Sequence, residues 1–528
     1  MKINTEKFLT SKLKGKVKLQ GPVVLVVLDG FGLSKNRKGN AVSLAKAPNF
    51  ARLWKEYPHT QLEASGRAVG LVNHQDGNSE AGHMNIGAGR VVEQDPVRIN
   101  RAIREGTFFK NPAFKHAVRH AQKYTGALHI MGMLGNRESA HAYPDHLHAL
   151  LKFAHMEGVQ KVYLHLFTDG RDSPPHAAMT LIHRLRRQMF PEQQIATIIG
   201  RYYAMERAKR WPVTELAYNA LVGGGKKCLC ADTPEEAILQ AYNRNETDEF
   251  IQPTMILPKA RIQSGDSVIF FNLRSDRARQ ITKPFVQKKF TQENPGSFKR
   301  KKILRNLLFV SMADFGPDLD HVVSAFPAVQ IPDSLPIALS ELRQLFIAES
   351  EKYAHVTYFI NGGYADPVNG EVRIKVESPH VAHYDLTPEM SAKQITDIVL
   401  RYIKYNSFDF FCINFANADM VAHTGNVSAT IHAIEEIDVE LGRLHAAVKQ
   451  SKGLLVITAD HGNAEEMINL ATGEADTEHS TNPVPLIMTA PGITFKQRNH
   501  AVLGDIAPTL LHVLGLSIPK DMTGKKLC

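Results

Sequence analysis

The stretch Val23-Val24-Leu25-Val26-Val27-Leu28-Asp29-Gly30 decides the fold, because six apolar residues end abruptly at an acidic residue and a glycine. A short run this rich in β-branched residues predicts a strand buried on both faces, as in a parallel sheet. Similar runs occur at 408–415 and 454–459, and helical patterns lie at 392–405 and 429–448. This alternation predicts an α/β fold with a doubly wound sheet.

Ligand-type side chains follow these strands. Ligands of such sheets bind at the carboxyl ends of the strands, so we expect these side chains to meet at one edge. Asp419 and His423 share one face of a predicted helix, and His479 lies in a predicted loop. A mixed oxygen and nitrogen set suits Mn²⁺, Zn²⁺ or Mg²⁺, and its size suggests two ions. The candidate ligands are Asp29, Asp419, His423, Asp460, His461 and His479.

A candidate nucleophile lies in the glycine-rich stretch 77–90. Its Ser79 is either a helix-capping serine or a nucleophile at a helix N-terminus, where backbone N–H groups favour an anion. A metal ion beside the hydroxyl would lower its pKa and make an alkoxide. Both interpretations place Ser79 at the start of a helix.

The middle of the chain predicts a second α/β domain inserted into the first. Apolar runs end at Leu134, Phe167, Ile199 and Phe271. Proline-dense connections mark the boundaries. We therefore expect one discontinuous domain and one insert, with these bounds: 1–96 and 327–528 for the first, 97–326 for the insert.

The positive charge is concentrated in the insert. The chain of 528 residues carries a net charge of +10, and the segment 97–326, with 34 basic and 21 acidic residues, carries +13. The outer segments carry +6 and −9. Basic charge favours nucleic acid, an anionic membrane or an anionic substrate, and its location favours a small anionic substrate held by the insert.

Composition excludes several classes of protein. Hydrophobic residues make up 43% and charged residues 22%, as in soluble globular proteins, and no run approaches the roughly 18 apolar residues of a membrane span. The four cysteines are too few for a disulfide framework. The lysine-rich residues 1–20 lack the apolar segment of a secretory signal. We expect a cytoplasmic protein without membrane or nucleic-acid partners.

Nine motifs in order make the chain similar to the cofactor-independent phosphoglycerate mutases of the alkaline phosphatase superfamily. The resemblance spans about residues 22 to 525. The motifs are Asp29-Gly-Phe-Gly, Gly77-Asn-Ser79-Glu-Ala-Gly-His, Asp169-Gly-Arg171-Asp172-Ser-Pro-Pro, Gly200-Arg201-Tyr-Tyr-Ala-Met-Glu-Arg207, Asn272-Leu-Arg274-Ser-Asp-Arg277-Ala-Arg, Glu351-Lys352-Tyr-Ala-His, Asn417-Ala-Asp419-Met-Val-Ala-His423-Thr-Gly, Thr458-Ala-Asp460-His461-Gly-Asn-Ala-Glu and His479-Ser-Thr-Asn-Pro-Val-Pro.

The resemblance implies an isomerase that interconverts 3-phosphoglycerate and 2-phosphoglycerate through a phosphoserine at Ser79. It implies a doubly wound alkaline-phosphatase-like domain interrupted by an α/β transferase-type domain, in a monomer that needs no 2,3-bisphosphoglycerate. Two divalent ions are implied, Mn²⁺ first, with Mg²⁺, Zn²⁺ or Co²⁺ as alternatives. The implied ligands are Asp29, Ser79, Asp460 and His461 for one ion, and Asp419, His423 and His479 for the other.

The resemblance also implies a set of substrate contacts. Guanidinium groups pair bidentately with phosphate and carboxylate, and Lys352 would neutralise charge on the transferring phosphoryl group. Asp172 would orient the glycerate hydroxyls, and His141 is a candidate proton shuttle or phosphate donor. The implied contacts are His141, Arg171, Asp172, Arg201, Arg207, Arg274, Arg277 and Lys352.

The stretch 134–147 departs from the family pattern. The family has Ser-Asp-Gly-Gly-Val-His-Ser-His before a His-Leu pair, whereas this stretch lacks both glycines and contains one more residue. His141 and His146 keep the family spacing. Glu206 and Ala208 each replace an aspartate. The changed loop keeps open one alternative function, a metal-dependent phosphatase or phosphodiesterase; a nucleic-acid-binding protein is the second alternative, based on the charge of the insert.

Overall fold

The apolar run Val23–Leu28 forms β1, the central strand of a seven-stranded sheet in the computed structural model, and all six side chains are fully buried. The structure describes residues 7–124, 126–137, 139–223, 228–316, 318–319, 321–490, 492–495 and 500–528. The chain divides into two units, which are described separately below. They comprise Met1–Gln94 with Val329–Cys528, and Asp95–Ala328.

The first unit is built on a mixed sheet in the order β12-β11-β13-β1-β14-β15-β2. The five strands from β12 to β14 are parallel, while β15 runs antiparallel to both of its neighbours. The strands of this sheet are β1, β2 (His59–Leu62), β11 (Gln344–Glu349), β12 (Val372–Val376), β13 (Phe410–Phe415), β14 (Leu454–Thr458) and β15 (Val484–Met488).

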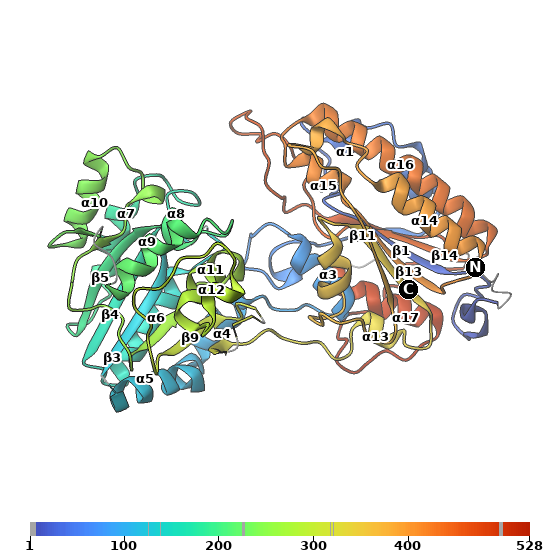
Figure 1. The fold of residues 1–528 in the computed structure, drawn as a ribbon. Helices are drawn as coiled ribbons and strands as arrows, with labels where there is room; N and C mark the ends of the chain where they lie inside the picture. The colour runs from blue at the N-terminus through green and yellow to red at the C-terminus, as the bar shows by residue number, and fades with distance from the viewer. Residues whose placement is uncertain are drawn as a thin grey trace. The chain divides into compact units, whose positions relative to one another are not determined.

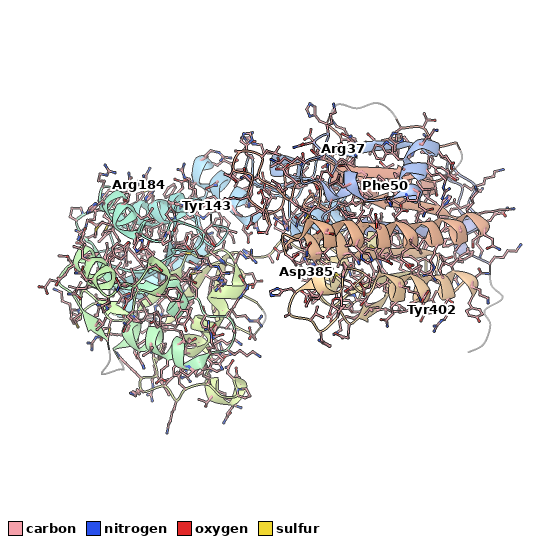
Figure 2. The ribbon with its side chains drawn as sticks, turned by 90° about the horizontal axis from the view of Figure 1, so that it is seen from above. Arg37, Phe50, Tyr143, Arg184, Asp385 and Tyr402 are labelled. Atoms are coloured by element: carbon pink, nitrogen blue, oxygen red, sulfur yellow. The ribbon has the colours of Figure 1, made fainter. Side chains whose placement is uncertain are left out.

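Helices cover both faces of this sheet, with α14, α15 and α16 on one side and α3, α13 and α17 on the other (Figure 1). Figure 2 shows α14, marked by Tyr402, alongside the long helix α16. Phe50 of α2 packs its ring 4.9 Å from that of Phe31, centroid to centroid. The helices are α1 (Ala41–Leu44), α2 (Pro48–Glu56), α3 (Ser79–Ala88), α13 (Leu335–Ala338), α14 (Ala392–Lys404), α15 (Asn417–Ala422), α16 (Val427–Gln450) and α17 (Ile506–Leu514).

The parallel register aligns the ends of the three central strands. Leu28 lies opposite Phe415 on β13, and Val27 lies opposite Thr458 on β14. The residues that follow these strands therefore emerge at one edge of the sheet, as the strand pattern predicts.

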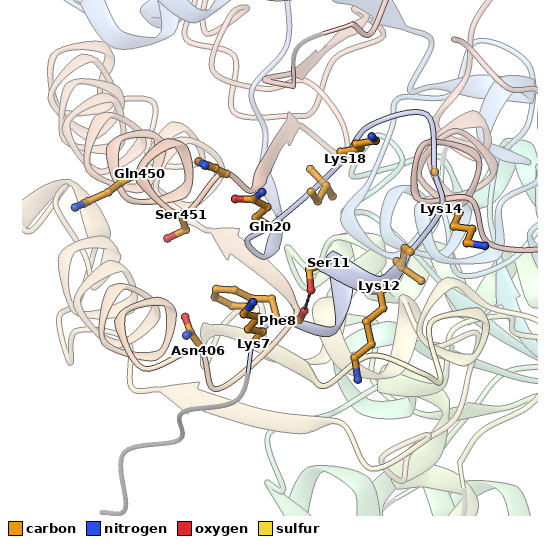
Figure 3. A pocket seen from close by; sticks show the side chains of 14 residues that line it. Lys7, Phe8, Ser11, Lys12, Lys14, Lys18, Gln20, Asn406, Gln450 and Ser451 are labelled. Carbon is orange, nitrogen blue, oxygen red and sulfur yellow. Dashed lines mark hydrogen bonds between the residues drawn. The ribbon is translucent and has the colours of Figure 1, made fainter.

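The N-terminal segment packs at the opposite edge, before β1 begins. There it borders an open pocket of about 980 Å³, together with the chain that follows α14 and the end of α16 (Figure 3). Lys7, Lys12, Lys14 and Lys18 line this pocket, and the labelled lysine side chains in Figure 3 spread in different directions. The lysine-rich start of the chain is thus packed against the first unit at a distance from the predicted ligands.

The second unit has its own eight-stranded sheet, in the order β10-β9-β8-β3-β4-β5-β7-β6. Every pair of neighbours is parallel except β5 and β7. The strands are β3 (Ala127–Leu134), β4 (Lys161–Thr168), β5 (Gln193–Gly200), β6 (Leu229–Cys230), β7 (Thr254–Met255), β8 (Ser267–Phe270), β9 (Leu308–Ala313) and β10 (Val322–Phe326).

Helices alternate with these strands along the chain, which is the α/β pattern predicted for this segment. In Figure 2, Tyr143 lies just before α6 and Arg184 lies on α7. The helices are α4 (Asp95–Glu105), α5 (Pro112–Tyr124), α6 (Pro144–Met156), α7 (Ala178–Arg186), α8 (Arg201–Ala204), α9 (Trp211–Val222), α10 (Pro234–Asn243), α11 (Ser275–Val286) and α12 (Phe290–Glu293).

The α/β prediction is confirmed, and its boundaries shift by a few residues. The strand expected over 408–415 starts at Phe410, and the helix expected over 429–448 extends to Val427–Gln450. Helix α16 starts earlier because the Asn426 side chain caps it by accepting the Ala429 N–H. Strand β15 and the edge strand β2, which pair antiparallel with each other, extend the sheet beyond the predicted parallel strands. Among the described residues, no helix is both long and apolar enough to cross a membrane.

Candidate active site

Ser79 is the first residue of α3, where sequence analysis placed it. The Asn78 side chain caps this helix by accepting the Ala81 N–H at 2.9 Å. The Ser79 hydroxyl is buried and lies 3.2 Å from Asp29 Oδ1 and 2.9 Å from His461 Nε2. Segments 50 and 382 residues away in sequence thus meet at one hydroxyl group.

Lys352 extends into the same cluster from the turn between β11 and a π-helical segment, His355–Phe359. Its buried ammonium group donates to Ser79 Oγ at 2.8 Å, and to Asp29 Oδ1 and Asp419 Oδ2 at 2.6 Å each. Burial alone would lower the pKa of Lys352, but the nearby carboxylates outweigh it and raise the pKa above its ordinary value. Lys352 was predicted to contact substrate; here it also neutralises two candidate metal ligands.

Asp419, His423 and His479 form a second group of polar side chains. Asp419 lies on α15, and His423 follows the end of that helix. Asp419 Oδ1 is 3.3 Å from the Nε2 atom of each histidine, and the two Nε2 atoms are 3.1 Å apart. The His479 loop is held by Gly77, whose carbonyl oxygen is 2.8 Å from His479 Nδ1.

The seven predicted metal ligands all lie in this one region of the first unit, where five are buried, His479 is partly buried and His423 is exposed. The side chains of Asp419, His461 and His479 place one donor atom each within 4.8 Å of one another. Asp29 and Asp460 form a similar set with His83. His461 thus lies among the donors of both groups, since its Nε2 is also 3.5 Å from Asp29 and from Asp460.

The donor set fits divalent cations. Asp460 Oδ2 is buried and accepts no hydrogen bond from the described residues, although His83 Nδ1 lies 3.2 Å away. Burial alone would lower the pKa of His461, but Asp460 and the neighbouring carboxylates raise it to about 10. An excess of buried carboxylates, with an unsatisfied oxygen, is an environment that a bound cation would stabilise.

Three residues at this site carried no predicted role. His83 Nδ1 donates to the Ser79 carbonyl oxygen at 2.9 Å, and His83 lies one helical turn after Ser79. Asn414 Nδ2 donates to Asp29 Oδ2 at 2.7 Å, and Asn463 Nδ2 donates to Asp419 Oδ1 at 2.8 Å. The i, i+4 spacing from Ser79 could have identified His83, as it did for the pair on α15.

The second unit holds the predicted substrate contacts other than Lys352. Arg201 begins α8 directly after β5; its side chain is buried and Nη1 pairs with Asp169 and, at 2.9 Å, with Asp172. Its Nε donates to no described protein atom. Burial alone would raise the pKa of Asp172, but the Ser139 hydroxyl and Arg201 outweigh it and lower the pKa. Asp169, which sequence analysis left without a role, thus orients Arg201.

The other arginines of this unit are more exposed. Asp276 brings two of them together, with Arg207 Nη1 at 2.9 Å and Arg274 Nε at 3.3 Å from its carboxylate oxygens. Arg277 Nη1 donates to the Met205 carbonyl at 3.3 Å. Burial and the neighbouring Arg201, Arg207 and Arg171 lower the pKa of Arg277, so positive charge is concentrated here.

The divergent loop contributes a buried histidine. The His141 N–H donates to Ser139 Oγ at 3.1 Å, and that hydroxyl in turn donates to Asp172. Burial lowers the pKa of His141 to about 4, and its Nδ1 has no partner among the described residues. Glu138, in the middle of this loop, lies outside the described residues.

Comparisons with known proteins show the family of this chain. Residues 21–518 match the model of the Metalloenzyme superfamily. A 2,3-bisphosphoglycerate-independent phosphoglycerate mutase of Clostridium novyi is 47% identical over 515 residues, which cover 96% of this chain and 99% of the relative. An enzyme of the same name, numbered 1, from Methanosarcina acetivorans is 47% identical over 96% of this chain and 98% of its own. A Leishmania mexicana phosphoglycerate mutase, solved at low cobalt concentration, aligns with a TM-score of 0.74 and 26% identity, covering 98% of this chain and 99% of its own.

The α/β fold, the clustered carboxylates and histidines, and the family match define a metal-dependent enzyme of the Metalloenzyme superfamily. Within that class, the three proteins named above are phosphoglycerate mutases, and each is covered over 98–99% of its length. The chain belongs to the 2,3-bisphosphoglycerate-independent phosphoglycerate mutases, and it is an isomerase.

Proposed function

We propose that this chain interconverts 3-phosphoglycerate and 2-phosphoglycerate through a phosphoserine at Ser79, without 2,3-bisphosphoglycerate. The observation that carries the proposal is the surroundings of the Ser79 hydroxyl. It lies 2.9 Å from a histidine nitrogen, 3.2 Å from a carboxylate oxygen and 2.8 Å from an ammonium group. A nucleophile with a proton acceptor and a positive charge in direct contact is suited to take a phosphoryl group.

The protein's own residues prepare this transfer. The Ser79 proton can pass to Asp29, whose Oδ1 accepts the hydrogen bond of the Ser79 hydroxyl at 3.2 Å. The amino end of α3 favours the negative charge that develops at Ser79, and Lys352 stabilises that charge from a second direction. The glycerate released from the phosphoryl group then needs to stay bound and reorient before it accepts the group on its other hydroxyl.

Two divalent cations complete the proposed site, with Mn²⁺ as the first candidate and Mg²⁺, Zn²⁺ or Co²⁺ as alternatives. When bound, such ions lower the pKa of a coordinated hydroxyl and neutralise charge on phosphoryl oxygens. We assign Asp29, Ser79, Asp460 and His461 to one ion. Asp419, His423 and His479 would hold the other.

Substrate binding is proposed for the second unit, as the substrate-binding transferase domain, and the first unit is proposed as the metal-binding phosphatase-like domain. The buried Arg201, with a free Nε, and the arginines around Asp276 provide planar donors for a carboxylate and a phosphate. Asp172 is held as an anion by Ser139 and Arg201, so it can accept hydrogen bonds from the glycerate hydroxyls. Arg171 and His141 complete the proposed set.

Product analysis tests the reaction. Purified protein is stripped of metal, reloaded with Mn²⁺, and incubated with 3-phosphoglycerate in the absence of 2,3-bisphosphoglycerate. We expect 2-phosphoglycerate, and ³¹P NMR separates the two esters from inorganic phosphate. Release of inorganic phosphate without 2-phosphoglycerate would establish the alternative, a phosphatase on the same scaffold.

Metal dependence, assembly state and location need separate measurements. A chelator should remove the activity and Mn²⁺ should restore it, since the donor set holds an excess of carboxylates; full activity in metal-free protein would refute the metal role. We also propose a monomer in the cytoplasm, the compartment where phosphoglycerate is metabolised. Sedimentation velocity and cell fractionation check these two points.

A further inference from the structure

Glu465 is a buried carboxylate that the proposed reaction does not use. Its side chain is 2% exposed, and no lysine, arginine or histidine among the described residues pairs with it. A buried charge without a cation is stable only when several hydrogen bonds satisfy it. The partners of Glu465 therefore show what keeps the charge in place.

Four donors from three separate loops satisfy this carboxylate. Oε2 accepts the backbone N–H groups of Gly32 and Asn463, each at 2.9 Å. Oε1 accepts the Ser480 hydroxyl and, at 3.0 Å, the Asn482 amide. The bond from Gly32 joins segments 433 residues apart in the chain, whereas the other three span 2 to 17 residues.

Each of these loops carries candidate metal ligands. Gly32 follows Asp29 by three residues, Asn463 follows His461 by two, and Ser480 is the neighbour of His479. Asn463 has a second connection, because its amide donates to Asp419 Oδ1 at 2.8 Å. Glu465 is thus one hydrogen-bonded residue away from Asp419, a ligand of one proposed ion. Its other link is through the chain, because two of its partners lie two or three residues from His461 and Asp29, ligands of the other ion.

Two glycines make room for this carboxylate. A Cβ atom on Gly32 would lie 2.2 Å from Glu465 Cδ, and one on Gly462 would lie 2.4 Å from Glu465 Oε1. Both distances are far below van der Waals contact, so any side chain at either position would displace the carboxylate. Glycine at 32 and 462 therefore serves the placement of Glu465.

We propose that Glu465 is a positioning residue, which holds the loops of Asp29, His461 and His479 in the arrangement that binds both metal ions. This inference rests on the metal site of the proposed function and deepens it. Residues that orient metal ligands typically change metal affinity by about 10–100-fold when they are replaced. Glu465→Gln keeps the shape but places an NH₂ group against donors, so it should loosen the loops.

The test measures Mn²⁺ binding rather than turnover. Metal-free wild-type protein and Glu465→Gln are titrated with Mn²⁺, and free Mn²⁺ is followed by its EPR signal. We expect Kd to rise about 10–100-fold in the variant, with partial recovery in Glu465→Asp. The matched control is Asp438→Asn, a buried carboxylate of α16 that accepts the N–H groups of Asn49 and Phe50 far from the ligands in sequence.

A structural role alone predicts a different result. In that case Glu465→Gln and Asp438→Asn would both lower the melting temperature, and the Mn²⁺ affinity of both would stay at the wild-type value. This result would overturn the inference and leave the proposed function intact. Wild-type protein that binds no Mn²⁺ would overturn the proposed metal site and the inference together. A double variant adds a check. Gly32→Ala alone should weaken Mn²⁺ binding, because the new Cβ would displace the Glu465 carboxylate. In Glu465→Ala that carboxylate is absent, so adding Gly32→Ala should weaken Mn²⁺ binding no further.

Discussion

The Lys352 ammonium nitrogen lies 2.8 Å from the Ser79 hydroxyl oxygen, and both groups are buried. The same nitrogen is 2.6 Å from Asp29 and from Asp419, one candidate ligand from each proposed metal group. In this structure, the Lys352 ammonium group thus contacts the proposed nucleophile and a carboxylate from each proposed metal group. The relationship suggests that the lysine and the metal ions balance the same buried negative charge.

Replacing the nucleophile should abolish turnover and spare the fold. For Ser79→Ala we expect mutase activity to fall by at least about 10³-fold, because the group that accepts the phosphoryl moiety is gone. The melting temperature should change little, since one hydroxyl is lost. A coupled assay for 2-phosphoglycerate and thermal unfolding measure the two effects. Ser43→Ala, at an exposed serine on α1, is the control, and near-normal activity of Ser79→Ala would refute the phosphoserine.

Removing the buried ammonium group should destabilise the metal-free protein most. Lys352→Met leaves Asp29 and Asp419 without their cation, which costs about 3–5 kcal/mol for a broken buried ion pair. Added Mn²⁺ should recover part of that loss, because it binds the folded state. Denaturant unfolding with and without Mn²⁺ measures both values. If Lys352→Met lowers the free energy of unfolding equally with and without Mn²⁺, or no more than the exposed control Lys393→Met does, the lysine and the metal ions do not balance the same negative charge.

Exchange of the guanidinium group should impair substrate binding. Arg201→Lys keeps the charge but loses the planar fork that pairs with Asp169 and Asp172. We expect kcat/KM for 3-phosphoglycerate to fall roughly 10–100-fold, the value of one or two charge-assisted hydrogen bonds. Arg210→Lys, at an exposed arginine paired with Glu206, is the control. An unchanged kcat/KM in Arg201→Lys would remove this residue from the binding set.

The second unit should lose stability in weak acid. Burial lowers the pKa of His146 from its ordinary 6.5 to about 4. Between these values the unfolded chain binds a proton that the folded chain does not, so the stabilisation is present above pH 6.5 and declines toward pH 4. The difference amounts to at most about 3 kcal/mol.

Urea unfolding at several pH values measures this effect. His146→Gln should make the decline between pH 6.5 and 4 less steep, because one of the titrating groups is absent, while His141 still titrates over the same range. His183→Gln, at an exposed histidine on α7, should behave as wild type. If the slope of stability against pH is the same in all three proteins, burial of His146 does not govern it.

Much of the fold could be read from short segments. An apolar composition alone predicts that Val23–Leu28 and the similar runs before Asp419 and Asp460 are buried strands. Because such strands run parallel, their ends lie at one edge of the sheet. The same local rules placed Ser79 at the start of a helix and Asp419 one turn before His423. Edge strands such as β2, with a mixed polar pattern, could not be predicted in this way because pairing partners decide them.

The sequence by itself predicted the candidate site residues and that strand ends bring them to one edge, since strand periodicity and helix capping depend on near neighbours. Only the tertiary structure decided which residues distant in sequence contact one another. It joined Lys352 to Ser79 across 273 residues, added His83 to Asp29 and Asp460, and connected three ligand loops through Glu465. Such contacts follow from the packing of distant segments, and no local pattern of residues records them.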